Sequence, residues 1–203
     1  MIYDVLIVGG GASGYGCGIT LASTNDKFEW AKDKKYLIID SGCSDIKKAS
    51  FYNLSGVEYG IGGDKLLQSL QAQLQKLKHC QLLNDTVIKI AKKDDIYEVH
   101  TNSQTFQTKI LVLATGMHQF DIECEGIDIT VLPHINVMKP QKVYLQNNNN
   151  QIDTNLYVCG LASGVKTMFA IANGDGVKVA CDIFESYTGK KAVAHDSIKD
   201  AIV

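Results

Sequence analysis

Residues 3–14 read Tyr-Asp-Val-Leu-Ile-Val-Gly-Gly-Gly-Ala-Ser-Gly, and this stretch decides the fold. Its first half, residues 3–8, is an apolar run rich in β-branched side chains, which is typical of a strand buried on both faces of a parallel sheet. The run enters the G-x-G-x-x-G of residues 9–14 without a gap, and a small-residue stretch able to form a helix follows at residues 15–23. Strand, glycine turn and helix in this order predict the opening of a dinucleotide-binding βαβ unit.

Each glycine of the motif has a physical task. Gly9 allows the tight turn, and Gly11 has no side chain, so a pyrophosphate can lie against the backbone. Gly14 lets the helix pack close to the strand, and Gly18 extends that thin face by one turn. The free N–H groups and the positive end of the helix then face the phosphates.

A second apolar run, residues 36–39, ends on Asp40, whose carboxylate can accept hydrogen bonds from a ribose diol. The gap between Gly14 and Asp40 is longer than a minimal unit needs, and we interpret residues 25–35 as a polar insertion. The alternative is a glycine-rich turn that merely starts an α/β domain. The complete order of strand, glycines, helix, second strand and acid favours the dinucleotide site.

Composition indicates one globular domain that spans residues 1–203. The chain is 45% hydrophobic and has a formal net charge of -2, so neither nucleic acid nor an anionic membrane is an expected partner. No apolar run approaches the ~20 residues of a membrane span. No signal peptide is visible before the first strand, and we therefore expect a cytoplasmic protein.

The six cysteines form no C-x-x-C and no metal-ligand spacing. We expect buried or half-buried free thiols in a reducing compartment. Cys43, which follows the second strand, is a candidate redox thiol, although an ordinary loop cysteine is the simpler interpretation. The five histidines are scattered, and only His118 is placed near the predicted site.

The middle of the chain predicts a loop at residues 51–64, with Asp64 as the N-cap of an amphipathic helix at residues 65–78. The leucines of that helix form one stripe, which can pack on the sheet or form a dimer seam. A strand at residues 80–83 precedes an antiparallel meander, which we place at residues 86–91, 97–101 and 106–109. Residues 110–114 then return as a separate strand to the parallel core.

The last third begins with a poorly patterned stretch, residues 117–140, in which we expect loop and short extended pieces. Four consecutive asparagines, residues 147–150, predict the solvated tip of a hairpin between residues 142–146 and 151–153. Residues 156–160 are the last buried strand, and residues 167–187 form a helix that Gly189 ends. The polar tail to Val203 is expected to be peripheral.

The complete pattern resembles the FAD domain of the thioredoxin reductase family, within the pyridine nucleotide-disulfide oxidoreductases. Asn53-Leu54-Ser55-Gly56 resembles the family's Asn-x-Pro-Gly loop, and Ala114-Thr115-Gly116 matches its Ala-Thr-Gly. Residues 154–160 resemble the last strand, and residues 172–180 the helix that follows. The resemblance implies an α/β, Rossmann-like FAD-binding domain with a central parallel sheet flanked by helices and a small antiparallel β-meander.

The resemblance also implies a set of FAD contacts. The glycine motif with Ser13 would hold the pyrophosphate, Asp40 the ribose, and the backbone of Val87 the adenine. Asn53 would lie near the ribityl chain or the flavin. Residues of the last turn and helix would line the isoalloxazine. The full implied set is Gly9, Gly11, Ala12, Ser13, Gly14, Asp40, Ser41, Asn53, Val87, Ala114, Thr115, Gly116, Gly160, Leu161, Phe169 and Ala170.

Three departures from the family pattern bear on function. Gly160-Leu161 stands where the family has Gly-Asp, whose carboxylate binds the ribityl chain. About 40 residues separate Gly116 from Leu156, too few for the family's NADPH domain. The redox C-x-x-C is absent from the sequence.

We therefore expect a FAD-dependent oxidoreductase that is reduced by external NAD(P)H, a small thiol or a redox partner protein, with catalytic residues unknown. The alternative is a non-catalytic FAD- or nucleotide-binding subunit or a redox sensor. A plain NAD-dependent dehydrogenase fits less well, because such domains lack the glycine-rich ending. A homodimer would cover the flavin face that so small a domain leaves open.

Overall fold

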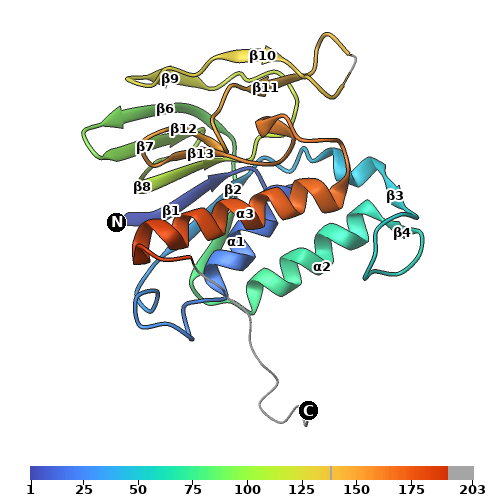
Figure 1. Cartoon of the computed structure of the whole chain (residues 1–203), viewed down its shortest axis with the longest axis horizontal. Coiled ribbons are helices and arrows are strands. Elements are labelled where there is room, and N and C mark those ends of the chain that lie inside the picture. The colour runs from blue at the N-terminus through green and yellow to red at the C-terminus, as the bar shows by residue number, and fades with distance from the viewer. Residues whose placement is uncertain (138, 192–203) are drawn as a thin grey trace.

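The computed structural model describes residues 1–137 and 139–191. The predicted tail, residues 192–203, lies outside the described residues. The fold is built on a sheet whose strands run in the order β5-β2-β1-β8-β7-β6-β9, with β13 beside β8 and β12 beside β13 (Figure 1). These strands are β1 Ile2–Val8, β2 Tyr36–Asp40, β5 Cys80–Asn84, β6 Val87–Lys93, β7 Ile96–Thr101, β8 Thr105–Leu113, β9 Glu123–Glu125, β12 Gln151–Asp153 and β13 Leu156–Val158.

The central strands β5, β2, β1, β8 and β13 are parallel, so their carboxyl ends meet at one edge of the sheet. Alternate side chains of β1 enter two different cores: Val5 and Ile7 pack on one face, and Leu6 and Val8 on the other. Burial on both faces explains why the opening strand is continuously apolar. The α/β fold with a central parallel sheet and a small antiparallel meander is confirmed.

The three α-helices that the structure describes, α1 Ala12–Ala22, α2 Gly63–Gln75 and α3 Phe169–Thr188, pack into the same core on one face of the sheet (Figure 1). The buried side chains of the antiparallel meander strands β6 and β7 pack into the core on the other face. Small residues let α1 and α3 approach closely, since a Cβ on Gly176 would lie closer than 3.0 Å to the carbonyl oxygen of Ser13. Among the described helices, none is both long and apolar enough to cross a membrane.

Helix α2 begins earlier than predicted. Its N-cap is Gly62, which makes no side-chain capping bond, and Asp64 lies in the first turn, so the prediction of Asp64 as the N-cap was wrong. The start is set by packing, because Gly63 lies against the carbonyl of Ile46, where a Cβ would not fit. The leucine stripe is confirmed, with Leu66 and Leu74 buried.

The meander is confirmed, but its last strand and the returning core strand are one element. Strand β8 runs without a break through Lys109 and Ile110. Its first half pairs antiparallel with β7, while it pairs parallel with β1 along most of its length and with β13 at its end. The predicted break between residues 109 and 110 was therefore wrong, because no turn is needed where one strand serves both parts of the sheet.

The strands predicted on either side of the asparagine run do not pair with each other, although Asn148 and Asn149 are exposed and Asn148 forms an antiparallel bridge with Gln151. Strand β11 (Val143–Leu145) pairs with β10 (Val131–Pro133), whereas β12 pairs with β13. Asn150 is only 6% exposed, and its amide donates to the carbonyl of Val158 over 2.9 Å. Strands β9 and β10, of three residues each, confirm the short extended pieces predicted for residues 117–140.

Several shorter segments complete the fold. A 3-10 helix, η1 (Asp45–Lys48), and a small hairpin of β3 (Ser50–Phe51) and β4 (Ile61–Gly62) follow β2. The polar insertion is anchored by Trp30, whose ring lies 5.3 Å from that of Phe184. Gly189 ends α3 in the left-handed conformation, as predicted.

Two glycines of α3 give a matched test of the α1–α3 contact. Gly176→Ala should lower the free energy of unfolding by about 1–3 kcal/mol, because the new methyl group overlaps the Ser13 carbonyl. Gly174→Ala should raise it by up to about 1 kcal/mol, because its Cβ meets nothing within 4 Å and alanine favours the helix. Urea unfolding followed by circular dichroism measures both. Equal effects of the two substitutions would contradict the packing argument.

Candidate functional site

A cleft of about 710 Å³ lies at the carboxyl edge of β1, β2 and β8. Its volume falls within the roughly 300–1,000 Å³ of ligand sites. The structure brings together in its wall most of the residues that the sequence predicts. These are Gly9, Gly11, Ala12, Ser13, Asp40, Ser41, Val87, Ala114, Thr115, Gly116, Leu161 and Phe169.

Four predicted residues lie outside this wall. Gly14 instead faces the carbonyl oxygen of Gly9, and Gly160 leaves room for the side chain of Ser13, so both serve packing. Asn53 and Ala170 are exposed to solvent and do not line the cleft. The structure therefore assigns two of the four a packing role and brings none of them into the cleft.

Other cleft residues were missed by sequence reasoning. Most follow the ends of β2, β5 and β8 directly, and that position in a parallel sheet could have identified them. Phe51, Met168 and Ala172 carry no such signal. The residues that sequence reasoning did not assign to the site are Val8, Gly10, Ile39, Cys43, Ser44, Asp45, Ile46, Phe51, Asp85, Thr86, Ile88, Met117, His118, Gln119, Asp121, Ile122, Thr167, Met168 and Ala172, of which Cys43 and His118 were weighed as candidates.

The glycine turn is shaped by two different constraints. Gly9 has a φ of +110° and lies against the carbonyl oxygen of Ala114, so a side chain there would be strained and would clash. Gly11 has an extended backbone with a φ of -90°, and its Cβ would meet only the Ser44 hydroxyl, at 3.6 Å. Gly9 is thus required by the fold, whereas Gly11 keeps open space in the cleft beside the start of α1. That start has no side-chain cap, which leaves its first-turn amides for an anion.

Asp40 is fixed at the end of β2 by the glycine turn itself. The N–H of Gly10 donates to Asp40 Oδ1 over 3.0 Å. A Cβ on Gly10 would lie 2.7 Å from the Asp40 Cγ, so this glycine is also required. A carboxylate can accept several further hydrogen bonds, and ribose hydroxyls are suitable donors.

Another part of the cleft wall is aromatic. The rings of Phe51 and Phe169 pack edge to face with their centroids 5.6 Å apart. Phe169 is the first residue of α3, whose N-cap Met168 makes no side-chain capping bond. A flat ring bound there would meet an apolar wall and the positive end of a helix.

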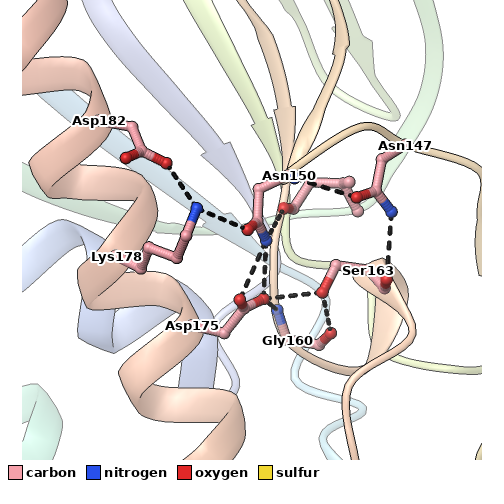
Figure 2. A network of polar contacts seen from close by, with 8 residues as sticks. Asn147, Asn150, Gly160, Ser163, Asp175, Lys178 and Asp182 are labelled. Carbon is pink, nitrogen blue, oxygen red and sulfur yellow. Dashed lines mark hydrogen bonds and ion pairs between the residues drawn. The ribbon is translucent and has the colours of Figure 1, made fainter.

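The turn after β13 is held from behind by a polar network (Figure 2). Asp175 of α3 accepts hydrogen bonds from the N–H of Gly160 (2.8 Å), the hydroxyl of Ser163 (2.7 Å) and the amide of Asn150 (2.9 Å). Lys178 donates to the Asn150 side-chain oxygen over 3.1 Å. The carboxylate faces the back of the turn, while the neighbouring Leu161 enters the cleft.

The carbonyls of the same turn, η2 (Gly160–Ser163), are bound from the other side. Buried His134 lies with Nε2 3.0 Å from the Leu161 carbonyl, and its Nδ1 accepts the N–H of Asn136. His134 is therefore neutral, with the proton on Nε2. Asn136 donates in turn to the Gly164 carbonyl over 2.6 Å. The turn is a rigid part of the cleft wall.

The cysteines are free thiols in the described structure, but they are not all buried. Burial raises the pKa of Cys80 and Cys159 to about 12, so both stay protonated at neutral pH. Cys43 is exposed and lines the cleft, so the expectation of buried or half-buried thiols was wrong for this residue. Within residues 1–137 and 139–191, no group of three or more His, Cys, Asp or Glu residues could hold a metal ion.

Comparisons with known proteins agree with this architecture. The sequence profile of a family described as pyridine nucleotide-disulphide oxidoreductase matches residues 3–160. A thioredoxin reductase of Borreliella burgdorferi is 23% identical over 81% of this chain and 52% of its own length. A ferredoxin–NADP reductase of Pediococcus pentosaceus is 28% identical over 63% of this chain and 39% of its own length. The chain thus spans about half or less of the length of these relatives.

Solved structures share the fold. A thioredoxin reductase from Gloeobacter violaceus superposes with a TM-score of 0.73 at 16% identity, covering 96% of this chain and 98% of that one. An oxidoreductase from Agrobacterium tumefaciens gives a TM-score of 0.72 at 12% identity over 92% of this chain and 98% of its own. At such identities the likeness concerns the Rossmann-like fold alone, and it confirms the predicted fold class.

The polar network behind the turn predicts a large effect of one carboxylate. Asp175→Ala should lower the free energy of unfolding by about 2–4 kcal/mol, because the Gly160, Ser163 and Asn150 donors lose their acceptor. Asp182→Ala, on the same helix, removes one half-buried ion pair with Lys178 and should cost at most about 1 kcal/mol. Thermal unfolding of both variants tests the difference, and a similar loss in both would refute the network's importance.

Proposed function

Because the chain belongs to the pyridine nucleotide-disulphide oxidoreductase family, we propose that it is a flavoprotein that binds FAD in this cleft and acts as an oxidoreductase. The observation that carries the proposal is the combination of two unlike sets of groups in one cleft. One set is the start of α1, the open space at Gly11 and the fixed carboxylate of Asp40. The other is the aromatic pair of Phe51 and Phe169 at the start of α3.

The residues present suit the two halves of the cofactor. The α1 amides would hold the diphosphate, Asp40 the adenosine ribose and the Val87 strand end the adenine. The flavin ring would lie towards the aromatic pair, where the start of α3 favours negative charge on the reduced ring. FAD would supply the hydride or electron transfer, while the chain binds, orients and shields it.

The relatives do not identify the electron donor and acceptor of this chain, because the chain spans only about half the length of the thioredoxin reductase that it matches. Its sequence contains one G-x-G-x-x-G and no C-x-x-C. We therefore propose that electrons come from free NAD(P)H or a redox partner protein. A single domain over residues 1–203, acting in the reducing cytoplasm, is consistent with the free thiols. A homodimer could cover apolar side chains exposed near the aromatic pair, such as Tyr52 and Met168.

One observation favours a second candidate, a non-catalytic FAD-binding subunit or sensor. The side chain of Leu161 is apolar, whereas thioredoxin reductases have a carboxylate at this position that binds the ribityl chain. Asp175 does not replace it, because its carboxylate already accepts hydrogen bonds behind the turn. The cofactor would then be structural or would report on a partner. Reduction of the bound flavin distinguishes the two candidates.

Cofactor binding is tested at Gly11. Gly11→Val should abolish FAD retention without unfolding the chain, because the side chain would enter the open space beside the α1 amides. Flavin content after reconstitution and gel filtration is the measurement. Gly62→Val is the matched control: Gly62 also caps a helix with extended backbone and open space, but it lies outside the cleft. Normal flavin content in the Gly11 variant would contradict the placement of the diphosphate.

Redox activity is tested separately on the FAD-loaded wild-type protein. Anaerobic addition of NADPH or NADH should bleach the flavin absorbance if the chain is an oxidoreductase that takes hydride directly. Dithionite serves as the control that the bound flavin can be reduced at all. Bleaching by dithionite but by neither nucleotide would favour a partner protein as donor or the sensor role.

A further inference from the structure

A polar contact crosses the cleft and is not explained by the binding of a dinucleotide. His118 Nε2 lies 2.6 Å from Asp45 Oδ2, and Lys142 Nζ lies 3.3 Å from His118 Nδ1. Lys142 also lies 4.0 Å from the Asp45 carboxylate. We call these three residues the cleft bridge. It joins η1, which follows β2, to the segment that follows β8, although Asp45 and His118 are 73 residues apart in sequence.

The two walls that the cleft bridge joins are each braced by the rest of the fold. On the Asp45 side, the carbonyl of Ala49 accepts the N–H of Gly63 at the start of α2 over 2.9 Å. On the His118 side, the carbonyl of Met117 accepts the N–H of Val143 over 3.0 Å. The cleft bridge therefore connects two supported walls rather than two free loops.

These walls flank the glycine turn. Ser44, next to Asp45, has its hydroxyl 3.6 Å from the position that a Cβ on Gly11 would take. On the other side, Gly9 lies against the carbonyl of Ala114, at the end of β8. All of these residues line the same cleft. A diphosphate against Gly11 would lie between the two walls, and the cleft bridge would enclose it.

The hydrogen bonds leave His118 little freedom to act as an acid or base. A lysine ammonium can only donate, so Nδ1 is the acceptor and Nε2 carries the proton that Asp45 accepts. Both ring nitrogens are engaged. The pKa of Asp45 is lowered, since hydrogen bonds from Lys48 and His118 outweigh the opposing effect of burial. His118 is thus a positioning residue that ties one wall to the other.

We propose that the cleft bridge controls retention of the cofactor, and that the dinucleotide enters and leaves when the contact between Asp45 and His118 opens. This inference rests on the proposed binding of FAD. The side chains of His118 and Asp45 are 52% and 40% exposed, so water and salt reach the contact. A hydrogen bond to a carboxylate that water and salt reach is weak, and salt screens the charge of Asp45, which makes opening frequent enough for exchange.

The test measures release of FAD from the loaded wild-type protein and from His118→Ala and Asp45→Ala. Each protein is diluted into excess ADP as competitor, and free FAD is collected by rapid filtration. Both substitutions should speed release by about twofold to fivefold, within the range that the loss of an exposed charged contact gives. Raising NaCl from about 0.1 to 1 M, which shortens the Debye length from about 10 to 3 Å, should speed release from the wild type but not from the two variants.

Two controls make the test specific. Lys48→Ala removes a partner of Asp45 that lies outside the cleft bridge, at 3.0 Å on the same wall, and should leave release unchanged. His118→Gln, whose amide can both donate and accept, should restore slow release. Unchanged release in His118→Ala and Asp45→Ala, equal acceleration in Lys48→Ala, or fast release in His118→Gln would each overturn the inference. A wild-type protein that takes up no FAD would instead refute the proposed function, and the inference with it.

Discussion

The cleft depends on main chain packed directly against main chain at three glycines. Gly14 of α1 lies against the carbonyl of Gly9, Gly9 lies against the carbonyl of Ala114, and Gly176 of α3 lies against the carbonyl of Ser13. These contacts bring the ends of β1 and β8 and the helices α1 and α3 to one point. A methyl group at any of them would displace the backbone of another element. Side-chain chemistry in the cleft is therefore secondary to this arrangement.

The sequence predicts this part of the fold well because its causes are local. Gly9 needs a left-handed φ and Gly14 needs close approach, and both requirements follow from their spacing after an apolar strand. The predictions were wrong where residues distant in sequence determine the local structure. The asparagine run is polar by composition, yet Asn150 is buried because Val158 and Asp175 accept its amide hydrogens. Nothing within the run itself indicates those partners.

The candidate site also combines residues that local sequence predicts with residues that only distant contacts place. Residues that follow parallel strands, such as Asp40 and Thr115, can be placed from the strand pattern alone, since those strand ends share one edge. Phe51 enters the cleft through a short hairpin that has no clear pattern in sequence. The contact of His118 with Asp45 depends on how two walls meet across the cleft. Sequence spacing contains no information on that distance.

The turn after β13 shows which parts of the cleft contribute shape and which can bind charge. Asp175 and His134 hold this turn by its N–H and carbonyl groups, so it contributes shape to the cleft, and Leu161 contributes apolar surface. Charge recognition must then come from the starts of α1 and α3. Helix α2 also begins without a side-chain cap, so a missing cap does not by itself mark a site. What distinguishes α1 and α3 is that both helices begin in the same cleft, which a dinucleotide with a flat ring would occupy.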